Sequence, residues 1–579
     1  SGPVSFSLTL MHTNDLHSHL LGTGPDNRFT PQVGDGDPVR GHFGRLATVM
    51  REIASQAQTA GEPCLIFDSG DSYCGTLFQL LGPATATTRL PEYEFFTDLG
   101  YTALGLGNHE FEAGESGLNV MLGKMRRYKP MVPIVATNLI LGRSAGVLRA
   151  HWNPDANPAS GGVLMPYLIH ACQVGTQTLH VGILGALGPD AAKLSLANRS
   201  EAHFVGFDDD AGKADLGALV AFLQERVSRL REQHQVDLVI LLLHGGREEE
   251  TAIAQGVTGI DLILAGHTHE TYVRQEGKTW ISQSGWRGEN LNVLALSREP
   301  SGLNLRHAET AVRAVDDTIV AATDQMAKFR EYESTLDQMI HPSGYSVLEP
   351  VCLIDRERRR ERWPNNQAGM LVVDALKTGV NARLIKPVHV YVSSYAMIRS
   401  DFLTPGGVPT VYQFSDIFRF SPLGHDPGGR GGAPVTVFHL TPKEVHLVLE
   451  AMHWFSRHTP AYEPVVSSGL TYELSMWGVP LVNRVHSLKL DGVPFESWPP
   501  LIRVAANEFL TRNLLRIRSI SGGMVDVSLR DEEGRPVTSL PSLALPPEHE
   551  ILAHQLRQQF PIPASGPISL PASLTIPMR

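Results

Sequence analysis

Residues 7–19 read SLTLMHTNDLHSH, a short apolar run followed at once by the polar side chains Asp15 and His17. The run Ser7 to His12 has the length and composition of a buried strand. Because one residue separates Asp15 from His17, both side chains can point to the same side at the end of this strand. A carboxylate and an imidazole together suit Zn, Mn, Fe or Co, and this donor set does not distinguish among those metals.

Four more blocks repeat this pattern of an apolar run, glycine and a ligand-type side chain: DSGD at 68–71, GLGNHE at 105–110, HGG at 244–246 and AGHTHE at 265–270. Any one block alone is better explained as a turn, but five in the same context favour a metal site. The candidate ligands are Asp15, His17, Asp71, Asn108, His244, His267 and His269. Two ions roughly 3.5 to 4 Å apart can hold a hydroxide and polarise phosphoryl oxygens. The set predicts a two-metal hydrolase of phosphate esters.

Length and charge limit the class of protein. At 579 residues the chain exceeds what one hydrophobic core organises, so we expect two or more domains. No apolar stretch approaches the roughly 18 residues needed to cross a bilayer, so we expect no membrane span. A net charge of −11 argues against a binder of nucleic-acid polymers, which use basic patches. Small anionic substrates remain compatible with local arginines.

The cysteines say little about the compartment. Four of them, at 64, 74, 172 and 352, are too few for a disulfide framework, and no CxxC pair indicates a structural zinc. Cys64 and Cys74 could pair in an oxidising compartment, although we favour two buried thiols. Localisation stays open: periplasmic or secreted if a signal peptide was removed, and cytoplasmic otherwise. We expect a monomer.

The first 310 residues alternate short buried strands with amphipathic helices, which is typical of a layered α/β or α+β domain. The expected strands are Ser7 to His12, Cys64 to Phe67, Thr102 to Gly105, Val132 to Ala136, Leu179 to Leu184, Leu238 to Leu243 and Leu262 to Leu264. Helical spacing is found at Leu46 to Ile53 and Leu216 to Leu230. The candidate ligands come just after five of these strands, and loops at strand carboxyl ends are where such proteins gather ligands.

We divide the chain into a catalytic domain at 1–312, a linker helix at 313–344, a second domain at 345–520 and a Pro-rich C-terminal extension at 521–579. We predict the linker helix because this segment contains a charged run without Gly or Pro. The second domain shows helices at Gly369 to Thr378 and Pro442 to His453, strands near Val388 to Val392, Val435 to Leu440 and Val485 to Leu490, and an expected mobile loop at Pro427 to Ala433. The extension, with one helix near Glu548 to Gln559, is expected to wrap the surface or be partly disordered.

The motifs HTNDLHSH, DSGD, GLGNHEF, LHGG and AGHTHE resemble those of the calcineurin-like metallophosphoesterases, and specifically the 5′-nucleotidase / UDP-sugar hydrolase family. The resemblance covers nearly the whole chain. It implies an α/β (α+β) fold class with an N-terminal four-layer metallophosphoesterase β-sandwich flanked by helices, a linker helix and a C-terminal α/β substrate-binding domain.

The same resemblance implies two divalent ions, which can be Zn, Mn, Co or Fe. Asp15, His17, Asp71 and His269 would hold one ion, and Asp71, Asn108, His244 and His267 the other, with Asp71 bridging. His109 matches the family's transition-state histidine. Its acidic partner is usually Asp and here is Glu112, which can still orient the imidazole and hold it protonated.

In the family, the C-terminal domain binds the substrate. Arg358, Arg362 and Arg399 match its phosphate-binding arginines, and guanidinium forks fit phosphate oxygens. The alternative for the charged run that contains Arg358 is a solvated face. The family's base-stacking PFGN reads PLGH at 422–425, and Phe509 keeps the second stacking ring while the GGDG after it is replaced. Phe509 is therefore either half of a nucleoside clamp or part of the core.

These residues favour a 5′-nucleotidase-type hydrolase that uses a dinuclear metal-bound hydroxide on a small phosphorylated substrate, by default a nucleotide. The changes at Leu423, His425 and the missing GGDG leave an alternative on the same core: a 2′,3′-cyclic-nucleotide phosphodiesterase or a non-nucleotide phosphatase. A thiosulfohydrolase is disfavoured because NHE at 108–110 follows the nucleotidase pattern. A non-catalytic binding protein is disfavoured because all seven ligands are present.

Overall fold

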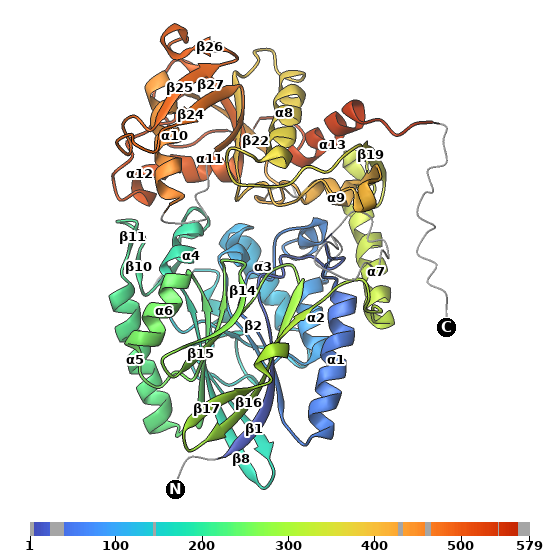
Figure 1. Ribbon diagram of the computed structural model, residues 1–579, viewed down its shortest axis with the longest axis vertical. Coiled ribbons are helices and arrows are strands. Elements are labelled where there is room, and N and C mark those ends of the chain that lie inside the picture. The colour runs from blue at the N-terminus through green and yellow to red at the C-terminus, as the bar shows by residue number, and fades with distance from the viewer. Residues whose placement is uncertain are drawn as a thin grey trace. The chain divides into compact units, whose positions relative to one another are not determined.

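The computed structural model describes residues 5–23, 40–142, 146–425, 432–457, 465–541 and 543–564 (Figure 1). Within these ranges the chain forms two compact units, which divide between Ser334 and Thr335. None of the helices in the described ranges is both long and apolar enough to cross a membrane. Cys64 and Cys74 are both free thiols, but only Cys74 is buried and Cys64 is partly exposed, so the expectation of two buried thiols is met in part.

The first unit contains two large β-sheets. One has the order β17-β16-β1-β2-β3-β4-β6, with β18 paired to β16, and the other has the order β14-β15-β13-β12-β8-β7. The strands of the first sheet are β1 Phe6–Thr13, β2 Cys64–Asp68, β3 Ala103–Leu104, β4 Ile134–Val135, β6 Leu164–Met165, β16 Asn290–Glu299, β17 Gly302–Arg306 and β18 Val312–Ala314. Those of the second are β7 Leu168–Val174, β8 Gln177–Leu187, β12 Leu238–His244, β13 Leu262–Gly266, β14 Thr271–Glu276 and β15 Thr279–Ser284.

The two sheets pack face to face over one apolar core. Leu10 and Phe67 from the first sheet share this core with Ile183, Ile240 and Leu264 from the second, and all are fully buried. Helices α1 (Phe43–Thr59) and α2 (Pro91–Leu99) lie on the outer side of the first sheet, and α5 (Leu216–Gln233) and α6 (Arg247–Gly256) on that of the second (Figure 1). The predicted four-layer arrangement is confirmed.

The strand register brings the ends of the central strands together. In the first sheet β1, β2 and β3 are parallel, with Thr13 opposite Asp68 and Asp68 opposite Leu104. In the second sheet β12 and β13 are parallel, and His244 lies opposite Gly266. The residues that follow these strands therefore leave each sheet at the same edge, as expected of a ligand-gathering edge.

The linker helix begins later than predicted. Helix α7 spans Thr323–Ile340, whereas the sequence suggested a linker from residue 313. The difference arises because β18 pairs with β16, with Ala314 opposite Asn290, and the Val315 N–H donates to the Glu289 carbonyl. These bonds keep the chain on the first sheet up to Val315, and the division between the two units falls inside α7.

The second unit combines three smaller sheets with helices. Its four-stranded sheet has the order β22-β27-β20-β23, its three-stranded sheet the order β24-β25-β26, and β19 pairs with β21. The strands are β19 Pro350–Ile354, β20 Val390–Ser394, β21 Thr410–Gln413, β22 Val435–Leu440, β23 Val465–Ser468, β24 Leu470–Leu474, β25 Val485–Leu490, β26 Val493–Pro494 and β27 Ile502–Asn507. The helices are α8 Gln367–Asn381, α9 Phe414–Phe418, α10 Pro442–Phe455, α11 Glu508–Leu515, α12 Ile517–Ile520 and α13 Glu548–Gln559. The helices and strands predicted here are confirmed, while most of the expected loop at 427–433 lies outside the described residues.

Helix α13 lies where the extension was predicted to contain a helix, but it belongs to the core of the second unit. Ile551, Leu552 and Leu556 are fully buried, and α13 packs against α8 and β19. Glu548, at its first turn, accepts a hydrogen bond of 2.7 Å from the Tyr391 hydroxyl on β20. The expected surface wrapping is therefore wrong for this helix, since an apolar face at helical spacing buries itself.

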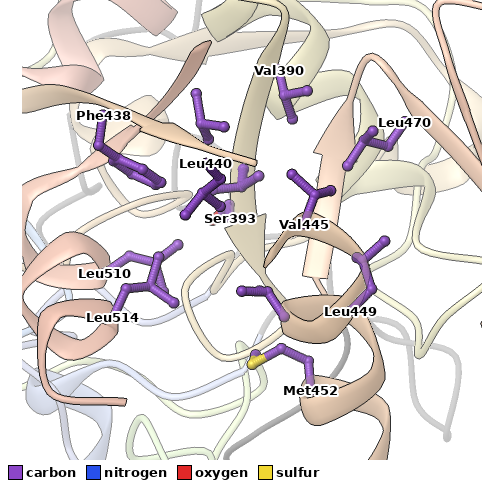
Figure 2. Close-up of a pocket in the computed structure, with 13 residues that line it drawn as sticks. Val390, Ser393, Phe438, Leu440, Val445, Leu449, Met452, Leu470, Leu510 and Leu514 are labelled. Atoms are coloured by element: carbon purple, nitrogen blue, oxygen red, sulfur yellow. The ribbon is translucent and has the colours of Figure 1, made fainter. Parts of the chain in front are cut away.

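The core of the second unit contains a cavity of about 40 Å³. Figure 2 shows side chains from β20, β22, α10 and α11 around it, among them Val390, Phe438, Leu449 and Leu514. Ser393 is the one polar residue in a lining that is otherwise apolar, and a cavity of this volume is too small for a nucleotide.

Candidate metal centre

Three of the candidate ligands form a first cluster at the end of β1. Oδ1 of Asp15 lies 3.6 Å from Nε2 of His17 and 3.4 Å from Nε2 of His269. The two imidazole nitrogens are 3.2 Å apart. One ligand atom from each residue lies within 4.8 Å of the other two. This spacing suits a single cation.

Three more candidates form a second cluster. Nε2 of His244 lies 3.0 Å from Oδ2 of Asp71, and His267 completes the group. Nδ1 of His244 donates to the Ser69 carbonyl at 2.9 Å, which leaves Nε2 as the ligand atom. Nε2 of His267 lies 3.0 Å from Oδ2 of Asp190 at the start of helix α4 (Pro189–Leu194), so Nδ1 is available for a metal. Sequence reasoning missed Asp190, which no motif marks.

Asp71 lies between the two clusters. Its Oδ2 atom is 3.0 Å from His244 in the second cluster and 4.0 Å from Nε2 of His17 in the first. Its Oδ1 atom accepts the His109 N–H at 2.8 Å, which fixes the plane of the carboxylate. This is the position that a carboxylate bridging two ions requires.

Two buried oxygens at the site accept no hydrogen bond from any described residue. These are Oδ1 of Asp15 and Oδ1 of Asn108, in residues that are 0% and 5% exposed. A buried acceptor without a donor destabilises a fold by about 1 to 3 kcal/mol. A divalent cation satisfies such an oxygen, so the residues present fit a metal centre. The N–H of His109, the residue after Asn108, donates to Oδ1 of Asp71, and this bond holds the Asn108 segment close to Asp71.

The backbone at the site is unusual. Five of the seven candidate ligands have a positive φ: Asp15 at 51°, His17 at 48°, Asp71 at 55°, His267 at 91° and His269 at 62°. Such conformations are uncommon for residues other than glycine and cluster at functional sites. The Asp15 N–H donates to the Gly70 carbonyl at 2.9 Å, and the His17 N–H donates to the Asp71 carbonyl at 3.0 Å. The loops thus hold one another in these conformations.

Two motif glycines permit this contact. A Cβ atom on Gly107 would lie 2.2 Å from Oδ1 of Asp71, and one on Gly70, at φ 97°, would lie 2.5 Å from the Gly107 nitrogen. Any side chain would force the two loops apart. The glycines before Asp71 and Asn108 are therefore needed so that the ends of β2 and β3 can approach.

Glu110 connects the same two loops. Its buried carboxylate accepts N–H groups from Asp71 at 3.0 Å, Ser72 at 2.9 Å and Gly107 at 2.7 Å. Burial raises the pKa of Glu110, and the neighbouring Asp71 carboxylate raises it further. Sequence reasoning quoted Glu110 within the NHE block without giving it a role, although its position beside Asn108 and His109 was a signal.

His109 and Glu112 form a pair beside the first cluster. Nδ1 of His109 lies 3.0 Å from Oε2 of Glu112, and both residues are buried. The His109 ring lies edge-on to the His17 ring, with centroids 5.2 Å apart. The pair is therefore close enough to act on a group bound at the first cluster.

An aromatic ring orients one ligand of the first cluster. The Trp286 ring stacks on His269 with centroids 4.4 Å apart and an angle of 19°. The Arg287 guanidinium lies over the Trp286 ring, 3.6 Å from its centroid, and the Arg287 N–H donates to the Asp15 carbonyl at 2.7 Å. Trp286 was missed because it lies after β15, outside every ligand motif.

The electrostatics of the site favour positive charge. Burial acts to lower the pKa of His244, but Asp71 and Asp15 raise it to about 10. Burial acts to raise the pKa of Asp15, but His244, His17 and His269 hold it well below its usual range. The carboxylates thus stay ionised in a buried setting, and cations are the natural partners of such groups.

The predicted phosphate-binding arginines all lie in the second unit, on two neighbouring segments. The backbones of Arg358 and Phe402 exchange hydrogen bonds of 2.8 and 2.9 Å, which places the segment of Arg399 beside that of Arg358. Nη1 of Arg358 pairs with Oδ1 of Asp355 at 2.9 Å. Arg399 is buried, whereas Arg362 is exposed, with its guanidinium 5.9 Å from the Tyr395 ring.

The sequence left two interpretations of Phe509, half of a nucleoside clamp or part of the core. Phe509 is partly exposed at the start of α11. Leu423, which replaces the other stacking ring, is 3% exposed, and its carbonyl accepts the Asn507 side chain at 3.5 Å. Leu423 therefore packs in the core and offers no open face, so a base could stack on Phe509 alone.

Comparison with known proteins agrees with this geometry. A family model described as calcineurin-like phosphoesterase matches residues 8–271. The 5′-nucleotidase of Rattus norvegicus is 31% identical over 265 residues, which are 46% of this chain and 38% of that protein. The match thus spans less than half of this chain and less than half of the relative's length.

Solved structures extend the likeness in fold to nearly the whole chain. A 5′-nucleotidase precursor from Thermus thermophilus has a TM-score of 0.69 at 18% identity, covering 96% of this chain and 97% of its own. The sulfate thiohydrolase SoxB of the same organism has a TM-score of 0.67 at 19% identity, covering 97% and 95%. Residues 8–271 therefore match the calcineurin-like phosphoesterase family, and part of the chain is similar to 5′-nucleotidases.

Proposed function

We propose that this protein is a metal-dependent hydrolase of phosphate esters of the 5′-nucleotidase type. The observation that carries the proposal is the Asp71 carboxylate between two clusters of ligand atoms, with the His109–Glu112 pair beside them. The similarity of 265 residues of this chain to a 5′-nucleotidase supports the same activity.

Two divalent ions are the proposed cofactor, drawn from Zn, Mn, Co and Fe because the donors are mixed nitrogen and oxygen. Asp15, His17, Asp71 and His269 would hold one, and Asp71, Asn108, His244 and His267 the other. When bound, such a pair supplies an activated water at neutral pH and Lewis-acid stabilisation of phosphoryl oxygens.

The protein's own side chains then act on the phosphoryl group. His109 lies beside the first cluster, where its other ring nitrogen, Nε2, can donate to a non-bridging or leaving oxygen as negative charge develops. Glu112 accepts from Nδ1, which holds the imidazole in one orientation and leaves Nε2 to face the phosphoryl group.

For the substrate we propose a nucleotide. Arg358, Arg362 and Arg399 would bind its phosphate oxygens, since guanidinium groups match them in geometry and charge. Phe509 would stack on one face of the base. Because only one aromatic ring would contact the base, we expect the enzyme to accept a wider range of bases than an enzyme that stacks the base between two rings.

Metal removal tests the reaction. Protein treated with a chelator should lose hydrolysis of an aryl phosphate and regain it with Mn or Zn. Asp71→Ala should stay inactive and retain fewer ions per chain by elemental analysis, because the residue contacts both clusters. Asp155→Ala, at an exposed position of the same unit, is the matched control and should behave as wild type. Activity that survives in Asp71→Ala would contradict the proposal.

A substrate panel tests the specificity. Rates should be compared on AMP, UDP-glucose, a 2′,3′-cyclic nucleotide and a sugar phosphate at equal concentration. A preference for AMP supports the nucleotidase, and kcat/KM that varies little among AMP, GMP and CMP supports the single stacking ring. Efficient cleavage of the sugar phosphate with none of AMP would contradict the proposed substrate while leaving the reaction intact.

A further inference from the structure

A third group of metal-ligand side chains lies beside the two clusters. Cys74, His109 and Glu112 each place one ligand atom within 4.8 Å of the other two, and all three residues are buried. Neither of the first two clusters contains sulfur. This third group, by contrast, offers a thiol, an imidazole and a carboxylate.

The loop that carries Asp71 fixes the position of Cys74. The Cys74 carbonyl accepts a hydrogen bond of 3.0 Å from Nδ1 of His17, and its N–H donates to Oγ of Ser18 at 3.0 Å. Its φ is 76°, a value that residues other than glycine rarely adopt. The surroundings thus hold the thiol next to the His109–Glu112 pair despite the backbone strain.

The donor set has a clear metal preference. Thiolate, imidazole and carboxylate are the ligands of zinc, and thiolate favours zinc and cadmium over the harder manganese ion. In tetrahedral zinc sites the bond lengths of about 2.0 to 2.3 Å put ligand atoms roughly 3.3 to 3.8 Å apart. Nδ1 of His109 and Oε2 of Glu112 are already 3.0 Å apart, and all three ligand atoms lie within 4.8 Å of one another, so side-chain rotations can bring them to this geometry.

We propose that Cys74, His109 and Glu112 form an inhibitory site for a thiophilic divalent cation, represented by Cd²⁺ or excess Zn²⁺. Binding releases the thiol proton and takes both members of the His109–Glu112 pair as ligands. A cation bound at Nε2 of His109 takes the atom that would donate to a phosphoryl oxygen, and a cation bound at Nδ1 displaces the Glu112 contact that orients the ring. The inhibitory consequence rests on the proposed hydrolase function, whereas the metal site itself does not.

Spectroscopy on the holoprotein tests the site directly. Protein reconstituted with Mn is titrated with Cd²⁺, and the ultraviolet absorption of cadmium–thiolate bonds is followed. Wild type should show the band with Mn retained by elemental analysis, and Cys172→Ser, which removes a partly buried thiol elsewhere in the first unit, should show it unchanged. Cys74→Ser and Cys74→Ala should lack it. The site would be overturned if the wild-type protein showed no band, whether Mn was retained or replaced. This outcome depends on the wild-type protein alone, so a misfolded variant cannot cause it.

Inhibition tests the consequence. Each protein's rate is normalised to its own rate without Cd²⁺, so that altered basal activity does not matter. Loss of a supporting contact behind a ligand already weakens metal sites about 10- to 100-fold, so loss of the thiolate should raise the half-inhibitory Cd²⁺ concentration at least about 100-fold. Equal half-inhibitory concentrations in wild type and Cys74→Ser would overturn the inhibitory role. If no phosphate ester is hydrolysed at all but the band depends on Cys74, the site stands and the proposed function fails.

Discussion

Nδ1 of His109 lies 3.0 Å from Oε2 of Glu112, although the family resemblance leads one to expect an aspartate at this position. The two residues are the ends of one 3-10 turn, His109–Phe111 with Glu112 as its cap. The longer glutamate side chain therefore still reaches the imidazole. The hydrogen bond is kept although the acidic residue differs from the expected aspartate.

Removing the charge of Glu112 should slow the chemical step. Glu112→Gln is expected to lower kcat about 10- to 100-fold and His109→Ala about 10²- to 10³-fold, with KM little changed, because both act on charge that develops in the transition state. Steady-state kinetics on AMP with the metal content verified is the measurement. Glu112→Asp, which keeps the charge at a shorter reach, should lie between wild type and Glu112→Gln. A Glu112→Gln variant with the kcat of wild type would contradict the proposed role of the His109–Glu112 pair in the chemical step.

Glu110 should be essential to the fold of the site. Glu110→Gln places an amide NH₂ against backbone N–H groups of Asp71, Ser72 and Gly107, so at least one buried donor loses its acceptor. We expect unfolding of the first unit to become easier by about 2 to 4 kcal/mol and the metal content to fall. Chemical denaturation gives the free energy. Glu309→Gln, at an exposed position, should leave both unchanged.

Glu548 should make the second unit more stable at low pH. Burial raises the pKa of Glu548 from 4.5 to about 7, against the lowering effect of hydrogen bonds from Ser421 and Tyr391. Between these values the folded state keeps a proton that the unfolded state has lost. The stabilising effect is thus fully present below pH 4.5 and is lost as the pH rises through about 7.

The change amounts to about 3 kcal/mol, from about 1.4 kcal/mol per pKa unit. Glu548→Gln should remove this part of the slope and should be at least as stable as wild type at pH 8. Denaturant unfolding of wild type and variant at pH 4.5, 6 and 8, with a probe in the second unit, provides the comparison. Parallel curves for the two proteins across this range would show that Glu548 stays ionised when folded.

Arg399 should contribute to substrate affinity without affecting the metals. A hydrogen bond to a charged group contributes about 1.5 to 3 kcal/mol, so Arg399→Ala is expected to lower kcat/KM for AMP about 10- to 100-fold. Arg399→Lys should recover part of it, since the charge remains but the fork is lost. Arg359→Ala removes an exposed arginine that pairs with Glu357 and serves as the control. Equal kinetics for Arg399→Ala and Arg359→Ala would exclude the proposed contact.

The order of apolar runs, glycines and polar side chains was enough to predict a layered α/β or α+β first unit and the set of candidate ligands, whereas the four-layer arrangement followed from the family resemblance. Strands such as β1, β2 and β12 are short, largely apolar and succeeded by polar or glycine residues, so local sequence specifies both where each strand ends and which side chains come after it. The linker was less predictable. Whether residues 312–314 form a strand depends on pairing with β16, and that pairing leaves no local trace in the sequence.

The sequence alone determined the chemistry of the candidate site, because residue type fixes donor type: carboxylate, amide and imidazole at the ends of strands. Only the tertiary structure decided how those donors are distributed between the two clusters. It placed Asp71 between His17 and His244, put Glu110 and Asp190 behind the ligands, and brought the Cys74 thiol to the His109–Glu112 pair. These relationships join segments far apart in the chain and depend on left-handed backbone conformations that neighbouring loops enforce, so no local pattern could reveal them.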